Sequence, residues 1–272
     1  ALSRISPFMT SPGGSAHPAA ASSNYAGYWA PATYSYQNPH PNIRKVDYSN
    51  DTTSTIPGAL VAGRYQRGAT GNKDFGYFAG GSPASFSGTS TTVSRIDYAN
   101  DNANALERGP LVNAVRQLAG VGNQNFGYFQ TGAVGPGAAE RIDYSNDTAT
   151  ASPSGSLGIE YDNGIAGNGN FAYIAGGAAT TSRVLRFDYS NDTTTASQRT
   201  YLSIAKTRLG ATGNKNFGYF SGGGPGPTYK SSIDRLDYSN DTATASPKGL
   251  LSGHHHNHAQ SPTSAAESNN PQ

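Results

Sequence analysis

The chain has 272 residues, of which 34 are glycine, 17 are tyrosine and none is cysteine, and it carries a net charge of +2. The weak net charge gives no field that would favour nucleic acid, and the lack of cysteine excludes disulfides and thiolate metal sites. No apolar run reaches 18 residues, so we predict no membrane span. Abundant glycine and tyrosine favour a β-rich chain with many tight turns.

The sequence divides into two short ends and a long repetitive region. Residues 1–18, rich in Ser-Pro and Gly-Gly, predict an extended arm that docks on another protein. They lack the charged and apolar regions of a signal peptide. Residues 19–252 form one domain, and residues 253–272 are a polar, histidine-containing tail.

Two sequence motifs recur five times, with a period of about 48 residues. The first is an aromatic motif that ends in Gly-Gly, as in 76–81, with a degenerate copy at 27–30. The second is an Asp-Tyr-x-Asn-Asp motif, as in 143–147. Successive copies of its first aspartate, starting at Asp47, are 50, 46, 45 and 49 residues apart. Insertions therefore fall between the motifs, which is typical of an array of structural units rather than of one irregular core.

Each repeat predicts four short strands. Phe75–Phe78 is an aromatic strand, preceded by a turn at Thr70–Lys73 that joins it to a small apolar strand. Arg95–Tyr98 alternates apolar and polar residues, which is a strand pattern. Ser145–Asp147 predicts the next turn, and Thr148–Ala151 a solvent-facing outer strand. Four strands in about 48 residues are the content of one propeller blade. The Gly-Gly pairs predict positive φ or close backbone packing.

The two ends of the repetitive region complement each other. Ser246–Ser252 begins a spacer between motifs, and Ala19–Asn24 resembles the end of one. An open solenoid would need polar capping repeats instead, and the sequence offers none. We therefore predict an all-β, five-bladed β-propeller over residues 19–252, closed by N- and C-terminal segments that share a blade.

The repeats resemble two known patterns. A strand ending in Gly-Gly, a variable loop and an Arg/apolar/Asp strand are similar to a Kelch blade, although Thr150, Thr195 and Thr244 stand where Kelch repeats usually have tryptophan. The repeats also resemble those of predicted virion proteins from phages of cyanobacteria and other aquatic bacteria, almost word for word in 142–152, 213–223 and 237–246. This second resemblance implies a virion structural protein, namely a fibre, appendage or capsid-surface component, present in multiple copies on the virion surface beside other virion proteins.

The repeated Asp-Tyr-x-Asn-Asp motif has two interpretations. Closely spaced oxygen ligands are what calcium requires, but the spacing of a calcium loop and its glutamate are missing. Asn and Asp side chains also bond to nearby backbone in turns, which is the interpretation we favour. In it, Asp97 and Asp143 either pair with Arg95 and Arg141 or accept backbone N–H bonds, and in either case they hold neighbouring blades together.

No other residue pattern identifies a metal or catalytic site. Alternate histidines in 254–258 would suit a transition metal on an extended segment, but they also fit a polar tail. Glutamate occurs only at 107, 140, 160 and 267, outside the repeated motifs, and no nucleophile, P-loop or zinc-protease motif is present. We therefore assign no metal, no cofactor and no catalytic residue, and we expect a protein that is not an enzyme.

Binding residues are expected in the loops that vary between repeats. Aromatic residues inside the strands are expected in the core, whereas Phe86, Pro136 and Tyr229 lie in the variable loops after the glycine pairs. The favoured function is a non-enzymatic virion protein that displays a propeller for attachment to a host surface or glycan, with avidity from multiple copies. A purely structural decoration or assembly protein and a non-viral lectin-like binding module are the alternatives.

Overall fold

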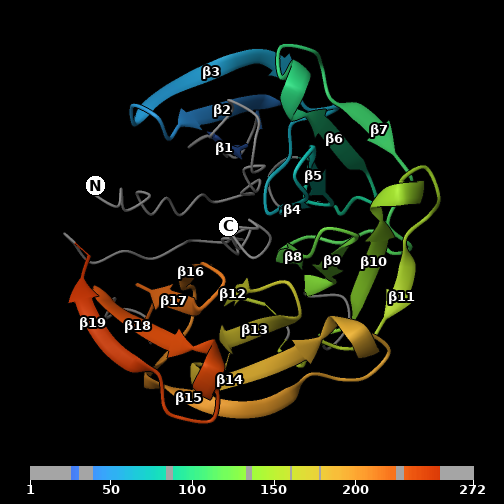
Figure 1. The fold of residues 1–272 in the computed structure, drawn as a ribbon. Helices are drawn as coiled ribbons and strands as arrows, with labels where there is room; N and C mark the ends of the chain where they lie inside the picture. The colour runs from blue at the N-terminus through green and yellow to red at the C-terminus, as the bar shows by residue number, and fades with distance from the viewer. Residues whose placement is uncertain are drawn as a thin grey trace.

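The structure is a computed structural model that describes residues 26–30, 39–83, 88–132, 137–159, 161–177, 179–224 and 230–251. Their strands form five antiparallel sheets arranged in a ring, so the fold is a five-bladed β-propeller (Figure 1). Within these ranges the helical segments are single 3-10 turns. The all-β class and the number of blades that the repeat predicted are confirmed. No helix in the part of the chain that is described is long and apolar enough to cross a membrane.

The blades follow one another in chain order, and within each blade the strands run from the axis outward. Blade 1 has three described strands and blades 2 to 5 have four each. The strands are β1 (Ala26–Trp29), β2 (Asn42–Asp47) and β3 (Thr52–Ala59); β4 (Gly68–Gly71), β5 (Phe75–Ala79), β6 (Val93–Asp97) and β7 (Leu106–Arg108); β8 (Gly120–Gly122), β9 (Phe126–Gln130), β10 (Ala139–Asp143) and β11 (Ser152–Ser154); β12 (Asn163–Gly167), β13 (Phe171–Gly176), β14 (Thr181–Asp188) and β15 (Ser197–Lys206); β16 (Gly210–Gly213), β17 (Phe217–Ser221), β18 (Ser232–Asp237) and β19 (Ser246–Leu250).

An asparagine fixes the first hairpin of each complete blade. The Asn72 side-chain oxygen accepts bonds of 2.9 Å from the backbone N–H groups of Asp74 and Phe75. The same pair of bonds recurs in the other complete blades, at Asn123, Asn168 and Asn214. The aromatic strand that follows is buried, with Tyr77 fully inaccessible to solvent, so the prediction that strand aromatics form the core is confirmed.

The glycine pair ends the aromatic strand in a conformation that other residues rarely adopt. Gly80 and Gly81 have φ values of +66° and +94°. A side chain on Gly81 would overlap the carbonyl oxygen of Tyr65, in the connection that enters the same blade. The pair thus supplies both positive φ and close backbone approach, as the sequence predicted.

The first aspartate of the second motif acts within its own turn. Asp97 caps a 3-10 turn at Tyr98–Asn100, where its Oδ1 atom accepts the N–H of Ala99 over 2.9 Å. Equivalent caps form in the other complete blades, at Asp143, Asp188 and Asp237. The predicted Asx bonding is confirmed. The prediction that Asp97 and Asp143 hold blades together is wrong, because their bonds stay inside one turn.

The last aspartate of the motif holds the blades together instead. Asp147 in blade 3 accepts bonds from Tyr77 Oη (2.8 Å) and Arg95 Nη1 (2.7 Å), both in blade 2. The Tyr77 ring also stacks on Tyr144 of blade 3, with centroids 4.8 Å apart. Burial, followed by the bond to Asp147, raises the pKa of Tyr77 above its ordinary value, so this hydroxyl stays a donor. We call this arrangement the clamp.

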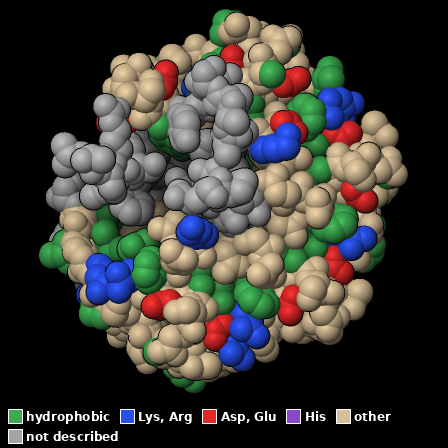
Figure 2. Space-filling model, viewed as in Figure 1, with side chains coloured by type: hydrophobic (Ala, Val, Ile, Leu, Met, Phe, Trp, Pro, Cys, Tyr) green, Lys and Arg blue, Asp and Glu red, His purple; other side chains and the backbone are tan. Residues whose placement is uncertain are grey.

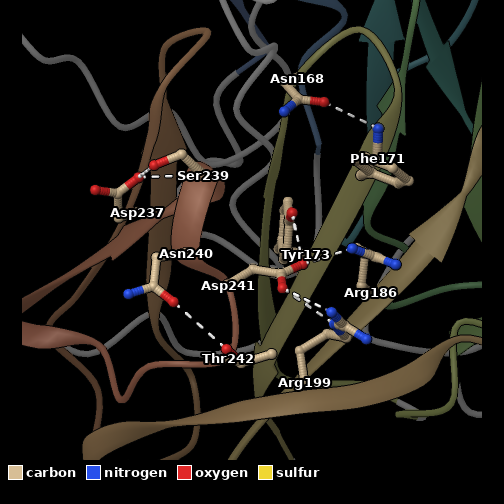
Figure 3. A network of polar contacts seen from close by, with 10 residues as sticks. All are labelled: Asn168, Phe171, Tyr173, Arg186, Arg199, Asp237, Ser239, Asn240, Asp241 and Thr242. Carbon is tan, nitrogen blue, oxygen red and sulfur yellow. Dashed lines mark hydrogen bonds and ion pairs between the residues drawn. The ribbon is translucent and has the colours of Figure 1, made fainter.

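The clamp recurs at four boundaries between blades. Figure 3 shows the one between blades 4 and 5, where Arg199 adds two further bonds to Asp241. In each, a tyrosine and a basic residue of one blade bind the aspartate of the next: Tyr28 and Lys45 with Asp101, Tyr77 and Arg95 with Asp147, Tyr128 and Arg141 with Asp192, and Tyr173 and Arg186 with Asp241.

Two predictions about the blade edges need correction. The outer strand of blade 3 is Ser152–Ser154, not Thr148–Ala151, because residues 148–151 continue the turn: Ala149 N–H bonds to Asn146. The fifth blade draws all four strands from 210–250, so it does not need an N-terminal strand to complete it. The segment Ala19–Asn24, predicted to supply that strand, lies outside the described residues, as do the predicted arm and nearly all of the tail.

Candidate functional site

Four polar residues stand within three positions before the innermost strands of blades 2 to 5. All four have left-handed backbone, with φ between +57° and +59°, although none is glycine. Such backbone costs a residue with a side chain roughly 1 kcal/mol or more, and it collects at functional sites. We call these residues the axial ring: Gln66, Gln117, Asp162 and Arg208.

Backbone hydrogen bonds join members of the axial ring to residues at the entry of the neighbouring blade. The N–H of Leu118 bonds to the carbonyl of Gln66 over 3.3 Å, and the N–H of Arg208 bonds to the carbonyl of Asp162 over 2.7 Å. The Arg208 guanidinium also lies 3.3 Å from the Asp162 carboxylate. These contacts link the entry turns of blade 2 with those of blade 3, and those of blade 4 with those of blade 5.

The glycine pairs place the variable loops beside the axial ring. Tyr65, just before Gln66, exchanges two backbone bonds of 2.8 Å with Ser82, just after the glycine pair of blade 2. In blade 5, the N–H of Gly224 bonds to the carbonyl of Thr207 over 3.0 Å. The predicted binding residues lie further along these loops. Phe86, Pro136 and Tyr229 all fall outside the described residues, so their placement stays a prediction.

Several buried polar groups next to the axial ring have no hydrogen-bond partner among the residues that the structure describes. Gln66 Oε1, Arg67 Nη2 and Arg64 Nε are buried and unpaired around the entry to blade 2. Between blades 3 and 4, Asn163 donates to Gln130 Oε1 over 2.9 Å, while Asn163 Oδ1 and Gln130 Nε2 are left unpaired. A buried polar atom without a partner is costly, which marks this region as one adapted to something other than stability.

Two arginines give the entry to blade 2 a positive charge. Arg67 is 6% exposed, and burial, together with the nearby charge of Arg64, lowers its pKa to about 9. It therefore remains mostly protonated at neutral pH. Its polar contact to a described residue is a 3.4 Å bond to the carbonyl of Ala62. The sequence analysis did not single out Arg67. Leu118 and Leu209 occupy the equivalent positions in blades 3 and 5, which suggests a purely apolar role for this position.

The acidic and histidine residues of the described ranges are the possible metal ligands. These ranges contain no group of three or more His, Cys, Asp or Glu side chains that could hold a metal ion. Glu140, a buried acid, accepts backbone bonds from Val112 (2.7 Å) and Asn113 (3.0 Å) and so fixes the connection into its own blade. The histidines at 254–258 lie outside the described residues. On the face shown in Figure 2, acidic and basic side chains form small mixed groups rather than one patch of a single sign.

Comparison with known proteins supports the propeller fold and does not indicate a function. No family model matches the chain, and no curated protein matches it. Among solved structures, the structure of YjhT is similar, with a TM-score of 0.66 and 13% sequence identity, over 92% of this chain and 87% of that chain. At so low an identity the likeness shows the propeller architecture alone.

Proposed function

We propose that the chain is a non-enzymatic phage virion protein, a fibre, appendage or capsid-surface component, that displays its propeller for attachment to a host-surface glycan. The axial ring and the loops beside it form the contact face. The resemblance of the repeats to virion proteins supports the setting on the virion surface, among other virion proteins and in multiple copies.

The observation that carries this proposal is the contrast between the clamp and the axial ring. The clamp repeats the same chemistry at four boundaries, as expected of a frame. The axial ring has glutamine in blades 2 and 3, aspartate in blade 4 and arginine in blade 5. It holds these side chains in a costly backbone conformation and borders buried polar atoms that no described residue pairs. Variable polar residues on a rigid scaffold are the usual construction of a binding face. Glycans, which present many hydroxyl groups, suit the amide and guanidinium groups at this face.

A purely structural role in decoration or assembly is the second candidate. It is favoured by the outer side of blade 5, where Leu250 is 73% exposed. An exposed apolar side chain at the end of a propeller would suit contact with a neighbouring protein.

Binding of fluorescently labelled protein to intact candidate host cells separates the two roles. Attachment predicts saturable binding that soluble cell-surface polysaccharide competes away. The matched variant is Arg67→Gln, which removes the buried charge at the contact face, with exposed Arg44→Gln as its control. Absence of saturable binding at high protein concentration would reject attachment and favour the assembly role.

A further inference from the structure

The boundary between blades 5 and 1 differs from the other four. Blade 5 carries the clamp donors of the repeat, including Arg235, whose guanidinium lies over the Phe217 ring at 4.5 Å. Its equivalents Arg95, Arg141 and Arg186 lie over their own phenylalanines in the same way, and each also binds an aspartate of the next blade. Arg235 forms no ion pair with a described residue, and its Nε atom is buried without a partner.

Glycines at the outer strands indicate that no described residue covers this side of blade 5. A side chain on Gly58, Gly109 or Gly155 would overlap a backbone carbonyl of the next blade. Gly249 occupies the same place in blade 5, eight residues after the clamp aspartate, and has no atom within 4 Å of such a side chain. The next residue, Leu250, is 73% exposed. In Figure 1, blades 1 and 5 are the first and last blades of the described ring.

Blade 1 does not present a matching aspartate to this side. Asp51 occupies the clamp position but is exposed and has φ +58°, whereas Asp101, Asp147 and Asp241 have φ between −70° and −74°. The cause is a one-residue deletion: seven residues separate Asp51 from Gly58, whereas eight separate Asp101 from Gly109. The shorter turn forms no 3-10 segment, and strand β3 begins directly after Asp51.

We propose that the open side of blade 5 is a docking surface for a separate polypeptide that inserts an aspartate-bearing β-turn, so that its carboxylate completes the clamp with Arg235. Two observations identify this occupant. The first is charge complementarity, because an unpaired, partly desolvated guanidinium favours a carboxylate, and bidentate or charge-assisted bonds to it are strong. The second is continuity, because the surface repeats an interface that the chain already builds four times with an aspartate.

Other occupants fit this surface less well. Residues 1–25 contain no Asp or Glu, and residues 252–272 contain only Glu267, so neither segment carries an Asn-Asp turn. A second copy cannot dock in the same geometry, because the blades attached to its inserted blade would overlap those already in the ring. The partner is therefore a β-rich segment that is not itself part of a closed propeller.

The test uses the fifth repeat itself as the probe. A labelled polypeptide with the sequence of residues 207–251 is titrated with the full chain, and fluorescence anisotropy is measured. The same probe with Asp241→Asn lacks the clamp carboxylate. We expect saturable binding of the first probe and at least roughly tenfold weaker binding of the second, since the second probe loses the charge-assisted bonds to the guanidinium.

Variants of the full chain locate the site. Arg235→Gln should weaken binding of the unmodified probe as much as the change in the probe does, and exposed Arg44→Gln should leave it unchanged. In a second experiment, the same repeat is fused to the full chain after its last described strand. We expect this fusion to unfold at a higher temperature than the full chain, and we expect Arg235→Gln to abolish the increase. Equal binding of the two probes, no effect of Arg235→Gln, or no binding and no stabilisation in either experiment would overturn the proposal. Self-association through this surface in sedimentation, abolished by Arg235→Gln, would overturn it in favour of a second copy.

Discussion

The hydroxyl of Tyr128 donates a hydrogen bond to Asp192 over 2.9 Å, across the boundary between blades 3 and 4. Arg141 binds the same carboxylate oxygen at 2.7 Å, and the Tyr128 ring stacks on Tyr189 beside it. One aspartate thus receives both side-chain bonds of the clamp at this boundary. Four such boundaries explain how a chain with only 35% hydrophobic residues holds a ring together.

The clamp makes a specific prediction about stability. Asp192→Asn removes the charge that two donors share and should lower the free energy of unfolding by about 2 kcal/mol, as expected for charge-assisted bonds in a partly buried setting. Asp51→Asn makes the same change where no clamp forms and should alter the free energy of unfolding by less than about 0.5 kcal/mol. Urea unfolding of both variants measures the difference, and equal values would contradict the role of the clamp.

A pair of glycine substitutions tests how the blades pack. A side chain at Gly109 would overlap the carbonyl oxygen of Ala149, whereas Gly249 has open space around it. Gly109→Ala should therefore cost about 1–3 kcal/mol through overpacking. Gly249→Ala should cost almost nothing. Thermal unfolding compares them, and a Gly249→Ala variant as unstable as Gly109→Ala would show that this side of blade 5 is covered.

Acid should weaken the boundary between blades 4 and 5. Burial alone raises the pKa of Asp241, but hydrogen bonds from Arg199 and Tyr173 outweigh it and leave the pKa below its ordinary value. The folded state therefore binds this proton less readily than the unfolded chain. The stabilisation is fully present above an ordinary aspartate pKa of about 4 and is lost as pH falls below it. Urea unfolding at several pH values should show this loss, and Asp241→Asn should reduce its slope.

A buried ion pair adds a boundary-specific contact. Lys206 of blade 4 and Asp234 of blade 5 lie 2.9 Å apart with both side chains fully buried. Lys206→Met leaves an unpaired buried charge and should destabilise the fold by about 3–5 kcal/mol. The double variant with Asp234→Leu should recover most of that loss, because two apolar groups then replace the pair. Lys215→Met, at an exposed position, is the control in chemical unfolding.

Much of the frame could be predicted because the motif encodes it locally. The Asn72 turn, the buried Tyr77 and the positive φ of Gly80 each depend on a few neighbouring residues, and all were predictable from the repeat. The contact between blades could not be predicted. Asp143 and Asp147 lie four residues apart in one polar turn, and the sequence does not show which of them reaches the other blade. Only the direction of the 3-10 turn decides that Asp147 faces the preceding blade.

The candidate site was less predictable than the frame. Gln117 shows no sequence signal for left-handed backbone, since glutamine is not a residue that favours positive φ. Arg67 stands at a position of the repeat where leucine would be expected, so only its burial in the structure marks it as a residue of the candidate site. The one signal that was available is the residue missing between Asp51 and Gly58, which marks blade 1 as different from the others.

The central claim is that the axial ring keeps a costly backbone for binding, and Gln117→Gly tests it most directly. Glycine adopts φ +59° without strain, so the variant should be as stable as the wild type or more stable by up to about 1 kcal/mol. If the ring is a binding face, the same variant should bind host cells more weakly in the polysaccharide-competed assay. Stability that is unchanged or higher together with unaltered binding would contradict the claim.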